Sequence, residues 1–165
     1  MRLQIKALLS LFFVTPVVAF PQTKVTTKDF RILSATVANW SSGTARENTD
    51  GARGVQYEIV AVVKSNKGIM IDSLITEKGS IAVEVIAGFR RSLGRAEVKK
   101  SDTVQIVARL VQGKSLPTLS KETRTAISKL KKPQQVSFLL YRNNGKRWLA
   151  PLGEFTKKSV SEPNQ

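Results

Sequence analysis

The chain is 165 residues long, which predicts a single domain, and it carries 27 Lys and Arg against 12 Asp and Glu, a formal net charge of +15. It has no cysteine and no histidine, so disulfides, zinc fingers, imidazole metal sites and catalytic triads with a histidine base are all excluded. The proportions of hydrophobic and charged residues, 41% and 24%, are close to those of an average globular domain.

The first residues have the pattern of a signal peptide. Arg2 and Lys6 precede an apolar run, and the small residues Val17 and Ala19 occupy the minus-three and minus-one positions of a cleavage site. The apolar run is shorter than the roughly 20 residues that span a bilayer. We therefore expect residues 1–19 to be removed and the mature protein to be secreted or periplasmic, with no transmembrane segment.

Most of the remaining chain has the alternation of short β-strands. Val55, Tyr57 and Ile59 alternate with Gln56 and Glu58, which is typical of a strand with one buried face. Runs of Gly, Asn, Ser and Lys between such segments favour turns. Seven strands are expected, at residues 30–40, 55–64, 69–76, 81–89, 104–110, 136–142 and 146–155. The expected core face of two of them consists of Ile81, Val83 and Val85 with Val104, Ile106, Ala108 and Leu110.

Two local signals refine this pattern. Asn143, Asn144 and Gly145 separate the last two expected strands, and Asn and Gly tolerate the positive φ of a hairpin turn, which predicts a C-terminal hairpin. Residues 119–130 have apolar positions at helical spacing, with Ser120 as a possible N-cap, and a proline follows at position 133. One short helix is therefore expected.

The predicted fold class is mainly β: an antiparallel β-sandwich, immunoglobulin-like in outline, with one short helix. A partly open β-barrel is the alternative, because alternation alone does not separate the two. The predicted organisation is a signal peptide at 1–19, an N-terminal extension at 20–28, a single β domain at 29–157 and a polar tail at 158–165.

Positive charge is concentrated in the second half of the chain. Residues 20–87 hold eight basic and seven acidic side chains, net +1, whereas residues 88–158 hold seventeen basic and four acidic, net +13. If the basic clusters meet on one rim of the fold, they attract anions. The candidate anion-binding residues are Arg90, Arg91, Arg95, Lys99, Lys100, Lys131, Lys132 and Arg147, with the first five in one loop-like segment. The expected partners are an anionic polysaccharide, lipopolysaccharide or an acidic protein.

The positive charge has two other interpretations. Lys and Arg also solubilise surfaces and protect sheet edges, in which case the protein is a structural or accessory one that uses a sheet edge or an apolar face. Tyr141 and Trp148 lie beside Arg142 and Arg147, as stacking rings in a nucleic-acid groove would, but strands also favour such rings for packing. No nucleic-acid-binding signature is present, and nucleic acid is not expected as a partner.

No catalytic motif supports an enzyme. Ser128 and Lys131 match a Ser-x-x-Lys pattern, but its companion motifs are missing. The carboxylates Glu58, Asp72, Glu84 and Asp102 are candidates for a glycosidase pair, although nothing in the sequence makes any two of them neighbours. We therefore expect a non-catalytic domain without a metal or cofactor.

Several short pieces of the chain occur in an order that is similar to a known group. They are Trp40-Ser-Ser-Gly43, Gly54-Val-Gln-Tyr57, Asp72-Ser-Leu74, Lys100-Ser-Asp-Thr-Val104, and Tyr141 with Gly145-Lys146. This order resembles small secreted β-rich proteins of Bacteroidota that have no established activity. The resemblance covers roughly residues 36–155 and implies export and a β fold, but it implies no site.

Overall fold

The structure is a computed structural model that describes residues 23–41, 53–88, 90–93, 96–130 and 137–158. The predicted signal peptide and most of the polar tail lie outside the described residues. The strands are β1 (Lys24–Val25), β2 (Phe30–Ser41), β3 (Arg53–Val63), β4 (Ile69–Thr76), β5 (Gly79–Ala87), β6 (Arg90–Leu93), β7 (Ala96–Val98), β8 (Thr103–Val111), β9 (Phe138–Asn143), β10 (Lys146–Pro151) and β11 (Thr156–Lys157), and the helix is α1 (Lys121–Ser128).

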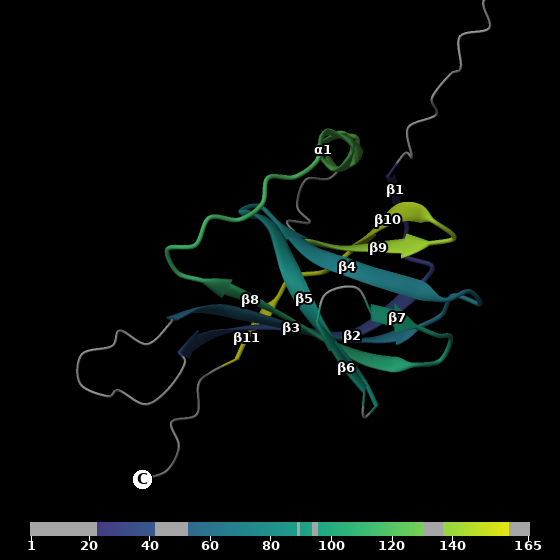
Figure 1. Cartoon of the computed structure of the whole chain (residues 1–165), viewed down its shortest axis with the longest axis horizontal. Coiled ribbons are helices and arrows are strands. Elements are labelled where there is room, and N and C mark those ends of the chain that lie inside the picture. The colour runs from purple at the N-terminus through teal and green to yellow at the C-terminus, as the bar shows by residue number, and fades with distance from the viewer. Residues whose placement is uncertain (1–22, 42–52, 89, 94–95, 131–136, 159–165) are drawn as a thin grey trace, which may run out of the picture.

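The strands form one curled sheet, so the prediction of a mainly β protein with one short helix is confirmed (Figure 1). The strand order is β1-β10-β9-β4-β5-β8-β3-β2-β11, with β6 added beside β5 and β7 beside β4. All pairings are antiparallel except those of the two-residue strands β1 and β11.

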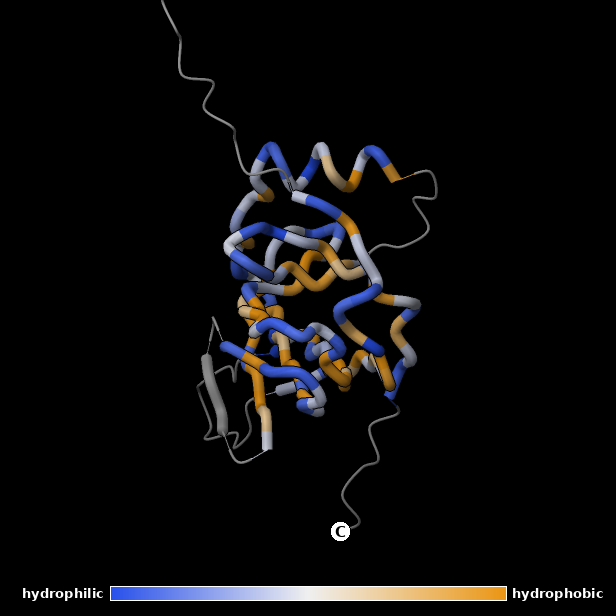
Figure 2. Tube along the Cα trace, turned by 90° about the vertical axis from the view of Figure 1, so that its right-hand side faces the viewer, coloured by the Kyte–Doolittle hydropathy of each residue, from blue (hydrophilic) through white to orange (hydrophobic). Residues whose placement is uncertain are grey.

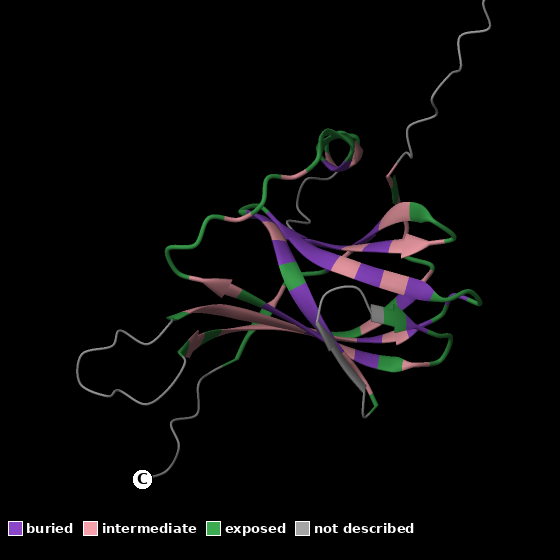
Figure 3. Cartoon of the chain, viewed as in Figure 1, coloured by how far each residue is buried: buried purple, intermediate pink, exposed green. Residues whose placement is uncertain are grey.

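Strand β5 connects the two halves of the sheet, because it pairs with β4 and with β8. Its first residues, Gly79 to Ala82, pair with β4, whereas Val83 to Ala87 pair with β8. A strand that changes partners along its length makes the sheet continuous where a sandwich would have two separate sheets. The arrangement is therefore the partly open barrel, the alternative to the immunoglobulin-like sandwich, because both halves of the sheet curl over a common core (Figure 3).

The predicted core faces of β5 and β8 are confirmed. Ile81, Val83 and Val85 are almost completely buried, as are Val104, Ile106 and Ala108, while Leu110 is half-buried and packs against the same cluster. Apolar stretches of the trace lie mostly in strands at the centre of the molecule, and hydrophilic stretches lie in turns and on the helix (Figure 2). Burial of these apolar side chains is the main contribution to stability that the fold offers.

Helix α1 lies across the outer face of β4, β9 and β10 (Figure 1). Its predicted N-cap is confirmed, since the Ser120 side chain accepts a hydrogen bond from the Thr123 N–H at 3.3 Å. The apolar residues of this segment form a second, smaller core against the sheet: Leu119, Ala126, Ile127 and Leu130 with Ile75, Phe138 and Leu149. The predicted proline stop at position 133 lies outside the described residues.

The predicted C-terminal hairpin is also confirmed. Asn143 ends β9 and Lys146 begins β10, with Asn144 at φ 55° and Gly145 at φ 69° between them. These two positive φ values are those of the hairpin turn that favours an Asn-Gly pair.

Candidate functional site

Four loops meet at one end of the barrel, at residues 26–29, 64–68, 99–102 and 144–145. Backbone hydrogen bonds connect three of them: Lys64 N–H donates to the Asp29 carbonyl at 2.8 Å, and Ser101 N–H donates to the Val63 carbonyl at 2.9 Å. The fourth loop is joined through Asn143, whose side-chain amide donates to Asp29 and to Ser65. The loops therefore have fixed positions relative to one another.

Exposed lysines lie on three of these loops and at the start of β10, directly after the fourth, and we call them the lysine rim. Its members are Lys28, Lys64, Lys67, Lys99, Lys100 and Lys146. Two carboxylates at the same end are already hydrogen-bonded within the fold, because Asp29 accepts from Tyr141 and Asp102 accepts from the Lys99 N–H at 2.9 Å. A third, Glu97, is exposed and lies over Gly68. Six cations against three anions leave this end positively charged.

A buried tyrosine anchors the rim to the core. Tyr141 is fully buried, its ring packs edge-on against Phe30 with centroids 5.0 Å apart, and its hydroxyl donates to Asp29 at 2.7 Å. Burial raises the pKa of the Tyr141 hydroxyl far above its usual value, and the hydrogen bond to Asp29 raises it further. Tyr141 therefore remains a neutral donor that holds Asp29 in place.

The structure brings together only part of the predicted anion-binding set. Lys99 and Lys100 belong to the rim, whereas Arg147 lines a cleft beneath α1. Arg95, Lys131 and Lys132 lie outside the described residues.

The interpretation of residues 90–100 as one loop-like segment is wrong. The segment contains two strands, and β6 pairs with β5 while β7 pairs with β4. Arg90 and Arg91 lie on β6, and their backbone stands opposite Ala87 and Ile86 of β5. The rim residues Lys99 and Lys100 follow a different strand, β7. The described structure does not extend to the side chains of Arg90 and Arg91.

Sequence reasoning missed the other rim residues. Lys28, Lys64 and Lys67 come from the half of the chain whose net charge is only +1, so the charge count did not single them out. The available signal was positional, because Lys67 lies in the turn predicted at residues 65–68 and Lys64 directly precedes it, and turns at strand ends meet at the end of a barrel.

A cleft of about 360 Å³ lies between the start of α1 and the outer face of β4, β5, β9 and β10. Arg142 and Arg147 stand directly opposite each other on β9 and β10 and both line it. Arg142 Nε bonds to the Asp72 carboxylate at 3.0 Å, which neutralises one of the two cations. The Ser80 hydroxyl donates to the Ser73 hydroxyl at 3.0 Å across the cleft wall.

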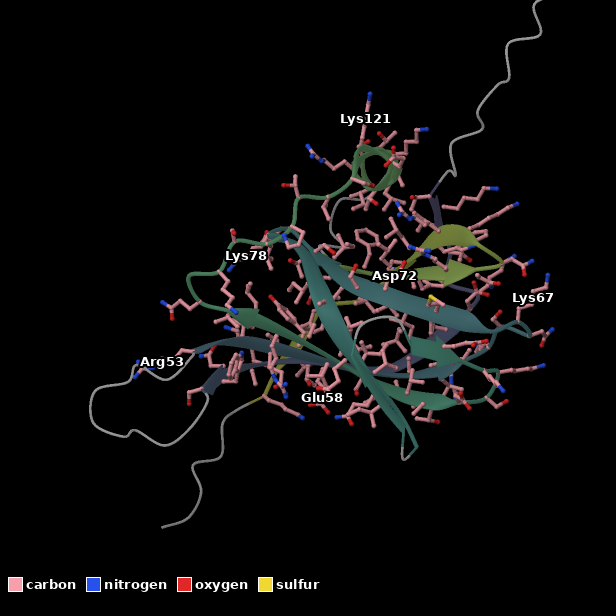
Figure 4. The ribbon with its side chains drawn as sticks, viewed as in Figure 1. Arg53, Glu58, Lys67, Asp72, Lys78 and Lys121 are labelled. Atoms are coloured by element: carbon pink, nitrogen blue, oxygen red, sulfur yellow. The ribbon has the colours of Figure 1, made fainter. Side chains whose placement is uncertain are left out.

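A β-bulge in β4 places Asp72 in this cleft. The register of β4 against β9 shifts between Ile71 and Ser73, so Asp72 has no Cα partner on β9. As a result Asp72 and Ser73 both line the cleft, while Ile71 and Leu74 both face the core. Bulges re-aim side chains in this way and are frequent beside functional sites. Figure 4 labels Asp72 on the strand below α1.

Two of the candidate carboxylates, Glu58 and Glu84, share an outer face of the sheet. Glu58 and Glu84 both stand opposite Val107 on β8, so their strands are about 10 Å apart. Glu58 bonds to Lys158 at 2.8 Å and to Gln105, and the hydrogen bond from Lys158 is the largest of the effects that lower its pKa. Both carboxylates are engaged in polar contacts on an outer sheet face, and Asp72 and Asp102 lie elsewhere.

Comparison with known proteins adds no assignment, since no protein-family model and no curated protein matches this sequence. The resemblance to secreted Bacteroidota proteins therefore stays an expectation. Across the described ranges, the only helix is too short to cross a bilayer, and no three Asp or Glu side chains gather as metal ligands would.

Proposed function

We propose that the protein is an exported, non-catalytic domain that binds a polyanionic component of the cell envelope, an acidic polysaccharide or the phosphates of lipopolysaccharide, through the lysine rim. The observation that carries this proposal is the gathering of six exposed lysines, from three separate loops and the start of β10, at one end of the barrel. Clustered cations repel one another and raise the local concentration of anions, so a polyanion lowers the energy of this surface.

The scaffold supports binding at this end. Asp29 and Asp102 are held by hydrogen bonds within the fold, so their side chains serve to fix the loops that display the lysines. Binding residues are commonly placed on loops that a rigid scaffold positions. The loops need little reordering when a ligand arrives, which lowers the entropic cost of binding.

A docking face made of apolar side chains has less support. Leu33 is the only large hydrophobic side chain exposed among the described residues, with 52% of its surface accessible. Single exposed apolar residues are ordinary on protein surfaces and do not form a patch. The alternative of a structural or accessory protein would therefore have to use a sheet edge.

A charge-reversal pair tests the rim. The rim variant replaces Lys64, Lys67, Lys99 and Lys100 with Glu, and the control variant makes the same change at Arg53, Lys78, Lys114 and Lys121. All eight positions are exposed, both variants move the formal net charge from +15 to +7, and the labelled control positions lie away from Lys67 (Figure 4). On heparin and lipopolysaccharide columns, the rim variant is expected to elute at much lower salt than the control. Equal losses in both variants would refute binding at the rim.

Export is tested separately by intact-mass analysis. The proposal requires mature protein that begins at Phe20, after loss of residues 1–19, in the secreted or periplasmic fraction. An intact N-terminus on the exported protein would contradict the proposed cleavage and would leave the binding test unaffected.

A further inference from the structure

The charged side chains that line the cleft beneath α1 leave one positive charge unpaired, as expected of a site that binds a monoanion. Among the described residues, its lining contains two cations, Arg142 and Arg147, and one anion, Asp72. Asp72 accepts a hydrogen bond from Arg142 and so compensates that guanidinium. Arg147 is half-buried and, among the described residues, forms no salt bridge. One guanidinium therefore faces the cleft with its charge uncompensated there.

Glu122, the acidic residue of α1, does not neutralise Arg147 within the cleft. Glu122 lies in the first turn of α1 and is fully exposed, and it forms no salt bridge within the described part of the chain. Its pKa is lowered mainly by a hydrogen bond to backbone and by Ser120, and the charge of Arg147 has a smaller effect. Glu122 does not line the cleft.

The rest of the lining is apolar or carries neutral hydroxyls. Ile75, Leu119 and Leu140 form apolar walls, and Ser73 and Ser80 contribute hydroxyls. A volume of about 360 Å³ is within the range of small-molecule sites, which combine apolar walls with a few fixed polar groups. Guanidinium groups bind carboxylates in a planar, two-point geometry. A dianion such as a phosphate monoester would leave one charge unmatched.

We propose that this cleft binds a small monocarboxylate with an apolar body, whose carboxylate pairs with the Arg147 guanidinium and whose apolar part lies against Ile75, Leu119 and Leu140. The site is separate from the lysine rim, and the proposal does not depend on the function proposed above. The ligand would neutralise the second of two like charges that stand opposite each other on adjacent strands, since Arg142 is already paired with Asp72.

The test is a titration of the full mature chain, followed by amide NMR, with 3-phenylpropanoate and hexanoate as probes and 3-phenylpropanamide as the uncharged control. Saturable shifts are expected at the amides of Ser73, Ser80 and Thr123, with a dissociation constant of about 1 mM or tighter for a carboxylate probe. The amide is expected to bind roughly tenfold more weakly, which corresponds to about 1.4 kcal/mol.

Two single substitutions, one in the cleft and one control, sharpen the outcome. Arg147→Gln is expected to weaken carboxylate binding roughly tenfold, whereas Lys114→Gln, which removes one charge from an exposed residue outside both the cleft and the lysine rim, leaves it unchanged. Thermal unfolding of each variant shows whether the fold is retained. If Arg147→Gln unfolds, Arg147→Lys is used instead and is expected to weaken carboxylate binding, because its ammonium keeps the charge but lacks the two-point geometry of the guanidinium.

The proposal is overturned by any of three results. One is the absence of saturable shifts from both carboxylates at about 10 mM. Another is equal binding of 3-phenylpropanoate and its amide. The third is a set of shifts confined to residues 64–68 and 99–102, which would place the probes on the lysine rim.

Discussion

Tyr141 links the core to the loops that carry the lysines. Its ring lies in the core against Phe30 while its hydroxyl reaches Asp29, which also accepts from Asn143 and whose backbone carbonyl receives the Lys64 N–H. One buried side chain thus fixes a residue that contacts two of the four loops. Loss of its hydroxyl leaves a half-buried carboxylate with one donor fewer.

Tyr141→Phe is expected to lower the free energy of unfolding by about 1 to 2 kcal/mol, measured by urea denaturation. Tyr57→Phe is the matched control, because Tyr57 packs edge-on against Phe155 at 5.1 Å but its hydroxyl forms no hydrogen bond among the described residues. The control is expected to change stability by less than about 0.5 kcal/mol. Equal effects of the two substitutions would show that the Asp29 contact contributes nothing.

The raised pKa of Tyr141 also sets a pH dependence. The folded state holds this hydroxyl neutral at pH values where the unfolded chain ionises it, with an unfolded pKa of about 10. Its contribution to stability is therefore complete below that pH and is lost as the pH rises beyond it. Above about pH 10, wild type is expected to lose stability with pH more steeply than Tyr141→Phe. Parallel stability curves for the two proteins would contradict this assignment.

Where apolar and polar residues alternate over a long stretch, as in β8, the strand and its buried face agree with the sequence prediction. Ile106 is fully buried at the centre of β8, so Ile106→Ala is expected to cost about 2 to 5 kcal/mol of unfolding free energy. Leu33→Ala removes an apolar side chain that is 52% exposed and is expected to cost less than about 0.5 kcal/mol. Denaturant titration of both variants checks the assignment, which fails if Ile106→Ala is as mild as the control.

The N-cap of helix α1 gives a second prediction about a single secondary-structure element. Ser120→Ala removes the acceptor for the Thr123 N–H and is expected to cost about 0.5 to 2 kcal/mol and to speed amide exchange at Thr123. Ser128→Ala is the control at the other end of the helix, since Ser128 donates to the Thr125 carbonyl and caps no N–H. If exchange at Thr123 is the same in both variants, the cap does not stabilise the helix.

The β-bulges in β4 and β2 are positions where alternation in the sequence does not predict which face a side chain occupies. Strict alternation along β4 would place Ile69, Ile71 and Ser73 on one face, and it fails after Asp72 because the extra residue resets the register. Leu33 is exposed for the same reason, since β2 shifts register between Ile32 and Ser34. Two-residue strands such as β1 and β11 are too short to show any period. The sequence did not predict the cleft, because the consecutive residues Asp72 and Ser73 lie on one face of β4, which strict alternation does not allow.

At the scale of the whole molecule, the distribution of charge along the chain differs from its distribution in space. The second half of the chain supplies most of the net charge, and its segment 90–100 divides between two strands that pair with different partners. The lysine rim instead gathers residues from both halves because the four loops end at the same side of the barrel. Topology, which sequence periodicity does not specify, determines which cations become neighbours.

The dependence of binding on salt tests the central claim most directly. The affinity of the mature protein for heparin is measured between roughly 50 and 200 mM salt, where counterion release makes the logarithm of the affinity fall linearly with the logarithm of the salt concentration. The account predicts a steep slope for wild type, a nearly equal slope for the control variant changed at Arg53, Lys78, Lys114 and Lys121, and a much shallower slope for the rim variant changed at Lys64, Lys67, Lys99 and Lys100. Slopes that fall equally in the two variants would mean that net charge alone governs binding, and would contradict a site at the lysine rim.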